Sequence, residues 1–276
     1  MQDQYSRTQI VLGANAMEKL ASARVAVFGV GGVGGYVVES LARSGVGELD
    51  IIDDDKICLT NINRQILATR KNIGQYKVDV AEERIHEINP LIKVNKYKCF
   101  YLPDNKDDFP FEEYDYIVDA IDTVTAKIDI ILEAQRLNIP IISAMGCGNR
   151  IDPTKLEVTD IYKTYNDPLS KVMRRELKAR GVKKLKVVYS TELPIKPLDD
   201  PNISCRNHCV CPDPDMRKCT ERRDIPGSTA FVPATAGLII GSIVCEELSE
   251  FDVNNRTISD PVYVWQDMVI KETKEE

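Results

Sequence analysis

The sequence predicts an α/β protein with a doubly wound, mostly parallel sheet of Rossmann type and a C-terminal extension. Three observations support this fold class. An apolar strand-like run, Arg24–Phe28, breaks into a glycine-rich turn that opens a helical pattern. Strand-like and helical patterns then alternate as far as residue 144. An acidic run at 53–55 follows the second strand, at the edge where open sheets of this class bind ligands.

Each element is assigned from its periodicity. The first two strands and the helix between them make one βαβ unit, whose strands run parallel. The next helix ends at Asn89-Pro90, because proline cannot continue a helix. In chain order we expect a helix at 14–20, a strand at 24–28, a helix at 33–42, a strand at 49–53, a helix at 78–88, strands at 92–97 and 115–120, a helix at 122–137 and a strand at 139–144.

The pattern changes after about residue 150. Strand-like pieces at 157–161 and 186–190, a basic helix at 169–179 and a loop rich in cysteine and proline precede an apolar segment at 230–244. We expect residues 151–276 to extend the core of residues 1–150 and to be continuous with it. Pro233 and Gly241 interrupt the apolar segment, which is too short to predict a membrane span. No charged-then-apolar leader precedes Val25, so we expect a soluble, cytoplasmic protein with no membrane partner.

The net charge is −7, so no overall positive field points to nucleic acid. One segment differs: between residues 163 and 186 there are nine Lys and Arg residues against Asp167 and Glu176. Such a patch attracts a phosphate backbone. A solvated helix face would explain the charge equally well, and composition alone leaves both interpretations open. The basic residues are Lys163, Lys171, Arg174, Arg175, Lys178, Arg180, Lys183, Lys184 and Lys186.

The glycine turn contains Gly29, Gly31, Gly32 and Gly34. Between a strand and a helix, such glycines let backbone N–H groups and the helix N-terminus approach a phosphate. Asp53 lies 19 residues after Gly34, where a carboxylate can bind a ribose hydroxyl. A glycine-rich packing turn is the alternative, but the strand–turn–helix context favours a nucleotide site.

Charged residues near this turn favour a triphosphate over a dinucleotide. Arg64 stands in a polar run at 61–65, and Lys77 opens the helix after Gly74-Gln-Tyr. Two cations suit a departing pyrophosphate, whereas backbone N–H groups satisfy a dinucleotide. Asp122 follows a buried strand and is placed to hold Mg²⁺ on phosphate oxygens. An N-cap role for Asp122, and ordinary surface roles for Arg64 and Lys77, are the alternatives.

The eight cysteines fall into two groups. Four are scattered, as expected of reduced packing residues. Four are bunched, and four thiolates are the ligand set of structural Zn²⁺. An iron–sulfur cluster would use the same ligands, and free or redox-paired thiols are a third interpretation. The scattered residues are Cys58, Cys99, Cys147 and Cys245, and the bunched ones are Cys205, Cys209, Cys211 and Cys219.

Together these motifs resemble the adenylating domain of the ThiF, MoeB and ubiquitin-activating-enzyme superfamily over residues 7–150. The resemblance implies an ATP-binding adenylating core at residues 1–150. It assigns Asp53 to the ribose, Arg64 and Lys77 to the phosphates, Asn61 to support of the phosphate and loop, and Asp122 to Mg²⁺. The residues that carry the resemblance are Gly29, Gly31, Gly32, Gly34, Asp53, Asp55, Asn61, Asn63, Arg64, Gln65, Lys77, Asp119 and Asp122.

The resemblance also implies a homodimer, in which Arg7 reaches the ATP of the partner subunit. Within the superfamily the second half is similar to the tRNA threonylcarbamoyladenosine dehydratases. This implies that ATP activates the carboxylate of threonylcarbamoyladenosine in tRNA, beside the anticodon, and that this group closes into a cyclic form. It also favours tRNA contact by the basic segment. The segments concerned are Ile151-Asp-Pro-Thr, Val158-Thr-Asp, Thr164-x-x-Asp167-Pro168-Leu and Val188-Tyr-Ser190-Thr191-Glu192.

Three other functions remain as alternatives. The first is an adenylyltransferase for a ubiquitin-like sulfur carrier, against which the absence of paired C-x2-C motifs counts. The second is an NAD-dependent oxidoreductase, which Arg64, Lys77 and Asp122 argue against. The third is a non-catalytic nucleotide-binding scaffold. A sulfur-relay use of Cys219 would need an accessory sulfur-transfer protein, and nothing in the sequence requires one.

Overall fold

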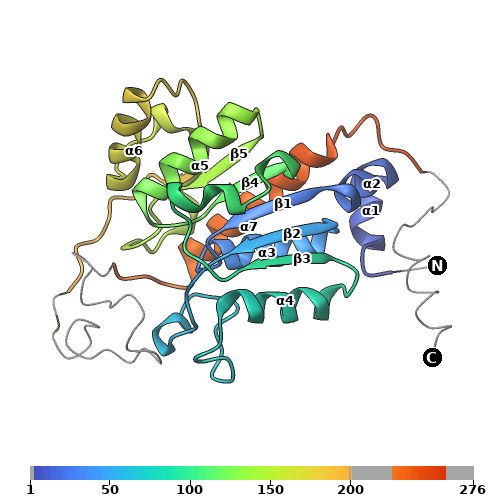
Figure 1. Cartoon of the computed structure of the whole chain (residues 1–276), viewed down its shortest axis with the longest axis horizontal. Coiled ribbons are helices and arrows are strands. Elements are labelled where there is room, and N and C mark those ends of the chain that lie inside the picture. The colour runs from blue at the N-terminus through green and yellow to red at the C-terminus, as the bar shows by residue number, and fades with distance from the viewer. Residues whose placement is uncertain (1–2, 199, 201–225, 259–276) are drawn as a thin grey trace.

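The computed structural model describes residues 3–198, 200 and 226–258. Within them the strands form one seven-stranded sheet in the order β3-β2-β1-β4-β5-β7-β6 (Figure 1). Neighbouring strands are parallel except β6 and β7, which are antiparallel. The predicted doubly wound, mostly parallel sheet is confirmed. The strands are β1 (Arg24–Phe28), β2 (Glu48–Ile52), β3 (Lys93–Tyr97), β4 (Tyr116–Asp119), β5 (Ile141–Ala144), β6 (Leu156–Asp160) and β7 (Lys186–Ser190).

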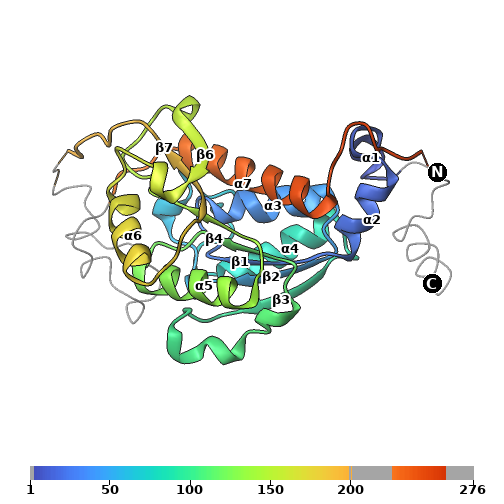
Figure 2. The ribbon, with the colours of Figure 1, turned by 90° about the horizontal axis from the view of Figure 1, so that it is seen from above.

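Helices cover both faces of this sheet. α3 and α7 lie on one face and α5 on the other, as Figure 2 shows. The chain changes faces between β1 and β4, and ligands of open α/β sheets bind at such a switch, beyond the carboxyl ends of the strands. The helices are α1 (Ser6–Leu12), α2 (Ala14–Ser22), α3 (Gly34–Ser44), α4 (Lys77–Ile88), α5 (Val124–Leu137), α6 (Pro168–Ala179) and α7 (Phe231–Ser249). The helix predicted at 122–137 and the strand predicted at 139–144 each begin two residues later.

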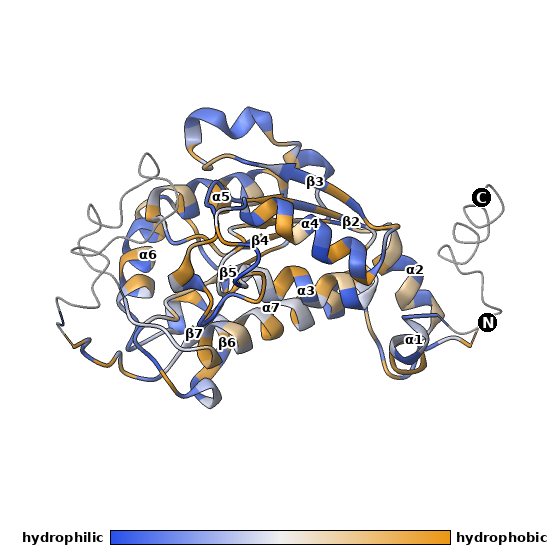
Figure 3. Cartoon of the chain, turned by 90° about the horizontal axis from the view of Figure 1, so that it is seen from below, coloured by the Kyte–Doolittle hydropathy of each residue, from blue (hydrophilic) through white to orange (hydrophobic). Residues whose placement is uncertain are grey.

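The apolar segment near the C-terminus is a long helix, α7, packed along α3. A Cβ on Gly241 would lie 2.0 Å from Ser40 Oγ, so the glycine that interrupts the apolar run is what permits the close approach. By length and composition alone, the 19 residues of α7 could cross a membrane, but 44% of the apolar window is buried inside the protein. Buried helices of ordinary proteins meet the same criterion. Figure 3 shows the hydrophobic residues along α7.

The chain after residue 150 adds to the same sheet. β7 pairs with β5 and carries β6 at the sheet edge. α6 packs against α5 through a third apolar cluster, in which Ile128 and Ile131 meet Met173 and Leu177. These contacts support the expected continuity between the core and the extension.

An N-terminal helix, α1, was not predicted. Tyr5, just before it, is 2% exposed, and its hydroxyl donates to the Ala42 carbonyl at 2.9 Å. The Asn89 amide donates to the same hydroxyl oxygen at 2.9 Å. Since α3 ends at Ser44 after running back from the glycine turn, these bonds fix α1 at the amino edge of the sheet.

Candidate active site

The candidate site lies at the carboxyl edge of the three central strands. β2, β1 and β4 are adjacent and parallel, so the turns that follow them meet at one edge. The contact is close: a Cβ on Gly29 would lie 2.8 Å from the carbonyl oxygen of Ala120. The turn after β4, which bears Asp122, therefore adjoins the glycine turn.

The glycine turn has the backbone that a phosphate site needs. Gly29 has a φ of +88°, a conformation that residues with a Cβ rarely adopt. A Cβ on Gly34 would lie 1.8 Å from the Gly29 carbonyl oxygen, so only glycine fits there. Among the described residues, no acceptor is found for the N–H groups of Gly31, Gly32 and Val33. Unbonded N–H groups at the start of a helix form an anion site.

Asp53 ties the second strand to this turn. One carboxylate oxygen accepts from the Val30 N–H at 2.8 Å and the other from the Asp55 N–H at 2.9 Å. Lys77 is 4% exposed, and its ammonium lies 2.6 Å from Asp55 and 3.3 Å from Asp53. Burial alone would lower the pKa of Lys77, but the two carboxylates outweigh it and the pKa is raised. Lys77 is thus a buried cation beside the turn, and it bonds carboxylates in this structure.

The segment at 61–65 folds over the glycine turn. Asn61 braces it by accepting from the Cys58 N–H at 3.0 Å. Gln65 is 8% exposed, and its Nε2 lies 3.8 Å from where a Cβ on Gly31 would be. The Gln65 Oε1 is buried without a hydrogen-bond partner in the described structure. A buried polar atom without a partner beside unbonded N–H groups fits a polar ligand in this turn.

Arg64 also borders the glycine turn. Its Cγ lies 3.6 Å from where a Cβ on Gly32 would be, and its guanidinium donates to the Thr60 carbonyl at 2.9 Å. Asn63 accepts a second bond from Arg64 at 2.9 Å and donates to the Ser228 carbonyl at 2.9 Å. The segment before α7 is therefore joined to the turn.

The turn after β4 rests on a buried ion pair that sequence reasoning missed. Lys127 and Asp119 are both fully buried, with 2.9 Å between Nζ and the carboxylate. Lys127 also donates to the carbonyls of Ile121 at 3.1 Å and Ala144 at 2.9 Å, so it braces the turn on which Asp122 stands. The sequence pattern that could have revealed Lys127 is its helical spacing from Ile130, Ile131 and Ala134, which places a lysine on the buried face of α5.

Asp122 itself is exposed and is not the N-cap of α5, a position that Thr123 occupies. The N-cap interpretation of Asp122 was therefore wrong. Across the described chain, the one group of three acidic, His or Cys side chains with ligand atoms within 4.8 Å of one another is Asp53, Asp54 and Asp55. Carboxylates thus flank the glycine turn, a donor set that suits Mg²⁺.

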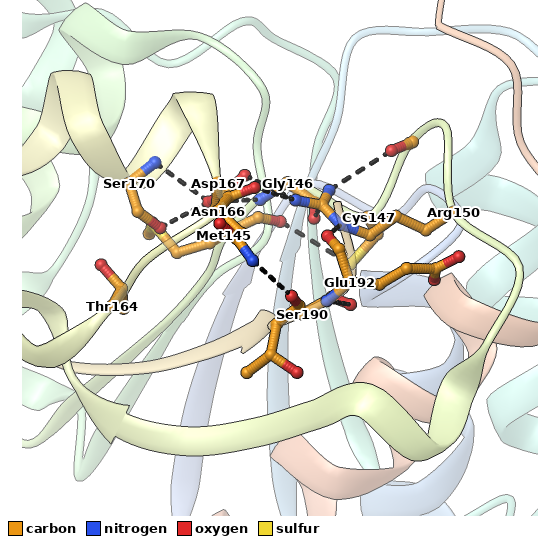
Figure 4. Close-up of polar contacts among 12 residues, drawn as sticks. Met145, Gly146, Cys147, Arg150, Thr164, Asn166, Asp167, Ser170, Ser190 and Glu192 are labelled. Atoms are coloured by element: carbon orange, nitrogen blue, oxygen red, sulfur yellow. Dashed lines mark hydrogen bonds and ion pairs between the residues drawn. The ribbon is translucent and has the colours of Figure 1, made fainter. Parts of the chain in front are cut away.

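The loop after β5 is held by a second buried pair (Figure 4). Arg150, 3% exposed, lies 3.1 Å from Asp167 and donates to the carbonyls of Gly146, Glu192 and Asn166. One side chain thus joins β5, β7 and the start of α6 at the carboxyl edge. Its partners lie 2 to 42 residues away in the chain, so no single spacing in the sequence reveals it.

Two sets of predicted site residues are not brought here. Arg7 is exposed on α1, at the amino edge, so it is remote from the glycine turn of its own chain. The four bunched cysteines, Cys205, Cys209, Cys211 and Cys219, lie outside the described residues. Of the four scattered cysteines, Cys58 and Cys245 are buried and Cys99 and Cys147 are half-buried. Burial raises the pKa of the thiols of Cys99 and Cys245, and raises that of Cys147 to about 12.

Known proteins resemble this chain over nearly its whole length. The ThiF family model matches residues 5–259. A relative from Bacillus subtilis (strain 168), named tRNA threonylcarbamoyladenosine dehydratase, is 40% identical over 261 residues, covering 94% of this chain and 100% of the relative. A protein of the same name from Escherichia coli (strain K12) is 36% identical over 243 residues, covering 85% and 89%. The crystal structure of the E. coli enzyme, TcdA, in complex with ATP has a TM-score of 0.77 at 34% identity, covering 90% and 94%.

Proposed function

Because this chain belongs to the ThiF family, we propose that it is an ATP-dependent enzyme that activates the carboxylate of threonylcarbamoyladenosine in tRNA and closes it into the cyclic form. The observation that carries the proposal is the anion site at the carboxyl edge. Within the described part of the chain, no acceptor is found for the N–H groups of Gly31, Gly32 and Val33, and the glycine turn that carries them adjoins the Asp122 turn through Gly29 and Gly34, in a chain similar throughout to the dehydratases.

The chemistry needs positioning and charge neutralisation more than a protein nucleophile. One oxygen of the substrate carboxylate attacks the α-phosphorus of ATP in line, and pyrophosphate leaves. A nitrogen of the same substrate then attacks the activated carbonyl carbon and AMP departs. The glycine turn N–H groups, Arg64 and Lys77 would stabilise the phosphate charge, and Asp53 would hold the ribose. Lys77 must then exchange part of its bonding to Asp53 and Asp55 for phosphate.

Mg²⁺ is part of the proposal. Bound at Asp122, it would neutralise phosphate charge and orient the leaving pyrophosphate. The buried Lys127–Asp119 pair supports this role, since it holds the Asp122 turn beside the glycine turn.

Four further proposals follow from the same assignment, and they concern the oligomer, the domain organisation, the cellular location and the substrate. The active unit is a homodimer in which Arg7 reaches the partner subunit's ATP, consistent with its remoteness from the turn in its own chain. An apolar surface suited to a dimer includes Phe231 at 57% and Leu238 at 49% exposure on α7. The chain forms one unit, with residues 151–276 as an extension of residues 1–150. It works in the cytoplasm on tRNA.

The four bunched cysteines are proposed as a structural zinc site, since four thiolates match that ion. Elemental analysis of protein purified without chelator tests it: about one zinc per chain is expected, and neither zinc nor iron would end the proposal. No observation requires a sulfur-transfer partner.

Adenylation of a ubiquitin-like sulfur carrier is the runner-up function. It uses the same anion site, but the relatives similar over the whole chain carry the dehydratase name.

Nucleoside analysis tests the proposed function. tRNA containing threonylcarbamoyladenosine is incubated with the protein, ATP and Mg²⁺, digested, and its nucleosides are separated by chromatography with mass detection. We expect a product lighter by one water, formed only with ATP. Unchanged threonylcarbamoyladenosine under these conditions would overturn the proposal.

A further inference from the structure

A groove between α5 and α6 lies next to the candidate active site. It has a volume of about 470 Å³, the size of a small-molecule site. Its floor is apolar, formed by Val124, Ile128, Leu132 and Val172, and its rim is polar. The rim residues are Thr125, Asp129, Arg175, Glu176 and Arg180, and Pro103 closes one side.

The groove begins two residues along the chain from Asp122. α5 starts at Val124, two residues after Asp122, so its first turn forms both the groove floor and the continuation of the Asp122 turn. α6 starts after Asp167, whose carboxylate accepts from the Gly146 N–H at the end of β5. Both helices therefore begin at the carboxyl edge, and the groove leads away from it.

The α6 side of the groove carries the positive charge that a polyanion would need, while the charged residues that line the groove itself are balanced, Arg175 and Arg180 against Asp129 and Glu176. Asp167 is buried and paired with Arg150, so Glu176 is the only acidic residue of the 163–186 segment that lies at the surface. Lys171, Lys178 and Lys183 of the same segment are exposed, and within the described chain no ion pair is found for them. Arg175 and Arg180 lie at the groove rim and bond Glu176 at 2.8 and 2.9 Å.

We propose that this groove binds an unpaired nucleoside of the RNA substrate, adjacent to the one being modified. The inference rests on the proposed function and adds the place where the tRNA is held. Proteins recognise single-stranded loops through unstacked bases, which stack on aromatic rings or on arginine planes and form hydrogen bonds through their edges. Here the aliphatic floor and Arg175 would hold the base, Asp129 and Glu176 would accept from its N–H groups, and the surrounding lysines would bind the phosphates.

A pair of arginine variants isolates the groove from general charge. Arg175 and Arg136 each pair with a glutamate of their own helix, at 2.8 and 2.5 Å, and their side chains are 76% and 61% exposed. Arg136 does not line the groove. We expect Arg175→Ala to weaken binding of an anticodon stem-loop about ten-fold, measured by fluorescence anisotropy, and Arg136→Ala to leave it unchanged.

A second variant, Thr125→Trp, fills the groove from the exposed first turn of α5 without removing charge. Wild type and Thr125→Trp are titrated with stem-loops in which each unpaired nucleotide beside the modified adenosine is replaced in turn by an abasic one. One abasic position should cost the wild type about ten-fold in affinity and cost Thr125→Trp nothing. The proposal would be overturned if Thr125→Trp bound the stem-loop without an abasic position as tightly as the wild type. It would also be overturned if no abasic position weakened binding to the wild type more than binding to Thr125→Trp. Either result would leave the groove to a protein partner. If the wild type still converts tRNA normally, only the groove proposal fails. If the wild type does not convert tRNA, the proposed function itself fails.

Discussion

Replacing Lys127 by methionine tests how the Asp122 turn is held. Both members of the Lys127–Asp119 pair are fully buried. Without the ammonium, the Asp119 charge has no counter-ion, and the carbonyls of Ile121 and Ala144 lose a donor. Breaking a buried pair by removing one partner costs about 3–5 kcal/mol. We therefore expect the free energy of unfolding to fall by that amount.

Urea unfolding followed by circular dichroism measures the loss, with an unchanged m-value as evidence that both states are otherwise alike. Adding Asp119→Asn to Lys127→Met removes the isolated charge, so the double variant should regain about 2 kcal/mol. Lys19→Met is the control, because the Lys19–Glu250 pair is exposed and should contribute little to stability. A loss below about 1 kcal/mol for Lys127→Met, or no recovery in the double variant, would refute the reasoning.

Three further predictions concern the site and its surroundings. Gly34→Ala should destabilise the fold and abolish ATP binding, because its Cβ would lie 1.8 Å from the Gly29 carbonyl oxygen, whereas Gly31→Ala meets nothing closer than 3.8 Å and should keep the melting temperature. Calorimetric titration with ATP and thermal melts decide this, and a stable, ATP-binding Gly34→Ala protein would contradict it. Asp122→Ala should lower Mg²⁺-dependent AMP formation on the order of 100-fold without lowering thermal stability, since Asp122 is exposed; unchanged turnover would remove its assigned role. Burial raises the pKa of Cys147 to about 12, so its alkylation by iodoacetamide should still be rising with pH above 9, and a plateau near pH 9 in peptide mapping would contradict that burial.

The sequence was enough for the parts of the fold that local patterns specify. The apolar run Arg24–Phe28 and the glycines that follow it predict a strand, a turn and a helix within a dozen residues. The structure has all three. α1 was missed because seven residues without a buried apolar stripe carry little periodic signal. The region of α7 was predicted only as an apolar segment. Its packing against α3 could not be predicted, because that packing depends on a contact between residues about 200 positions apart.

Local sequence patterns also located part of the candidate site, and they missed the residues that act through contacts distant in the chain. Asp53, Lys77 and Asp122 each stand at the end or start of a regular element, so their meeting at one edge follows from parallel topology. Lys127 and Arg150 act through partners distant in sequence, and no spacing rule reveals them. These two residues support the loops on which predicted site residues such as Asp122 stand.

In the proposed reaction the substrate carboxylate attacks ATP at its α-phosphorus. The direct measurement uses tRNA whose threonylcarbamoyladenosine carries ¹⁸O in its carboxylate, incubated with the wild-type protein, ATP and Mg²⁺, with mass analysis of the released nucleotides. Because one carboxylate oxygen stays with the α-phosphorus when AMP leaves, we predict one ¹⁸O in AMP for each tRNA converted and none in pyrophosphate. Formation of ADP with ¹⁸O in inorganic phosphate would contradict adenylation.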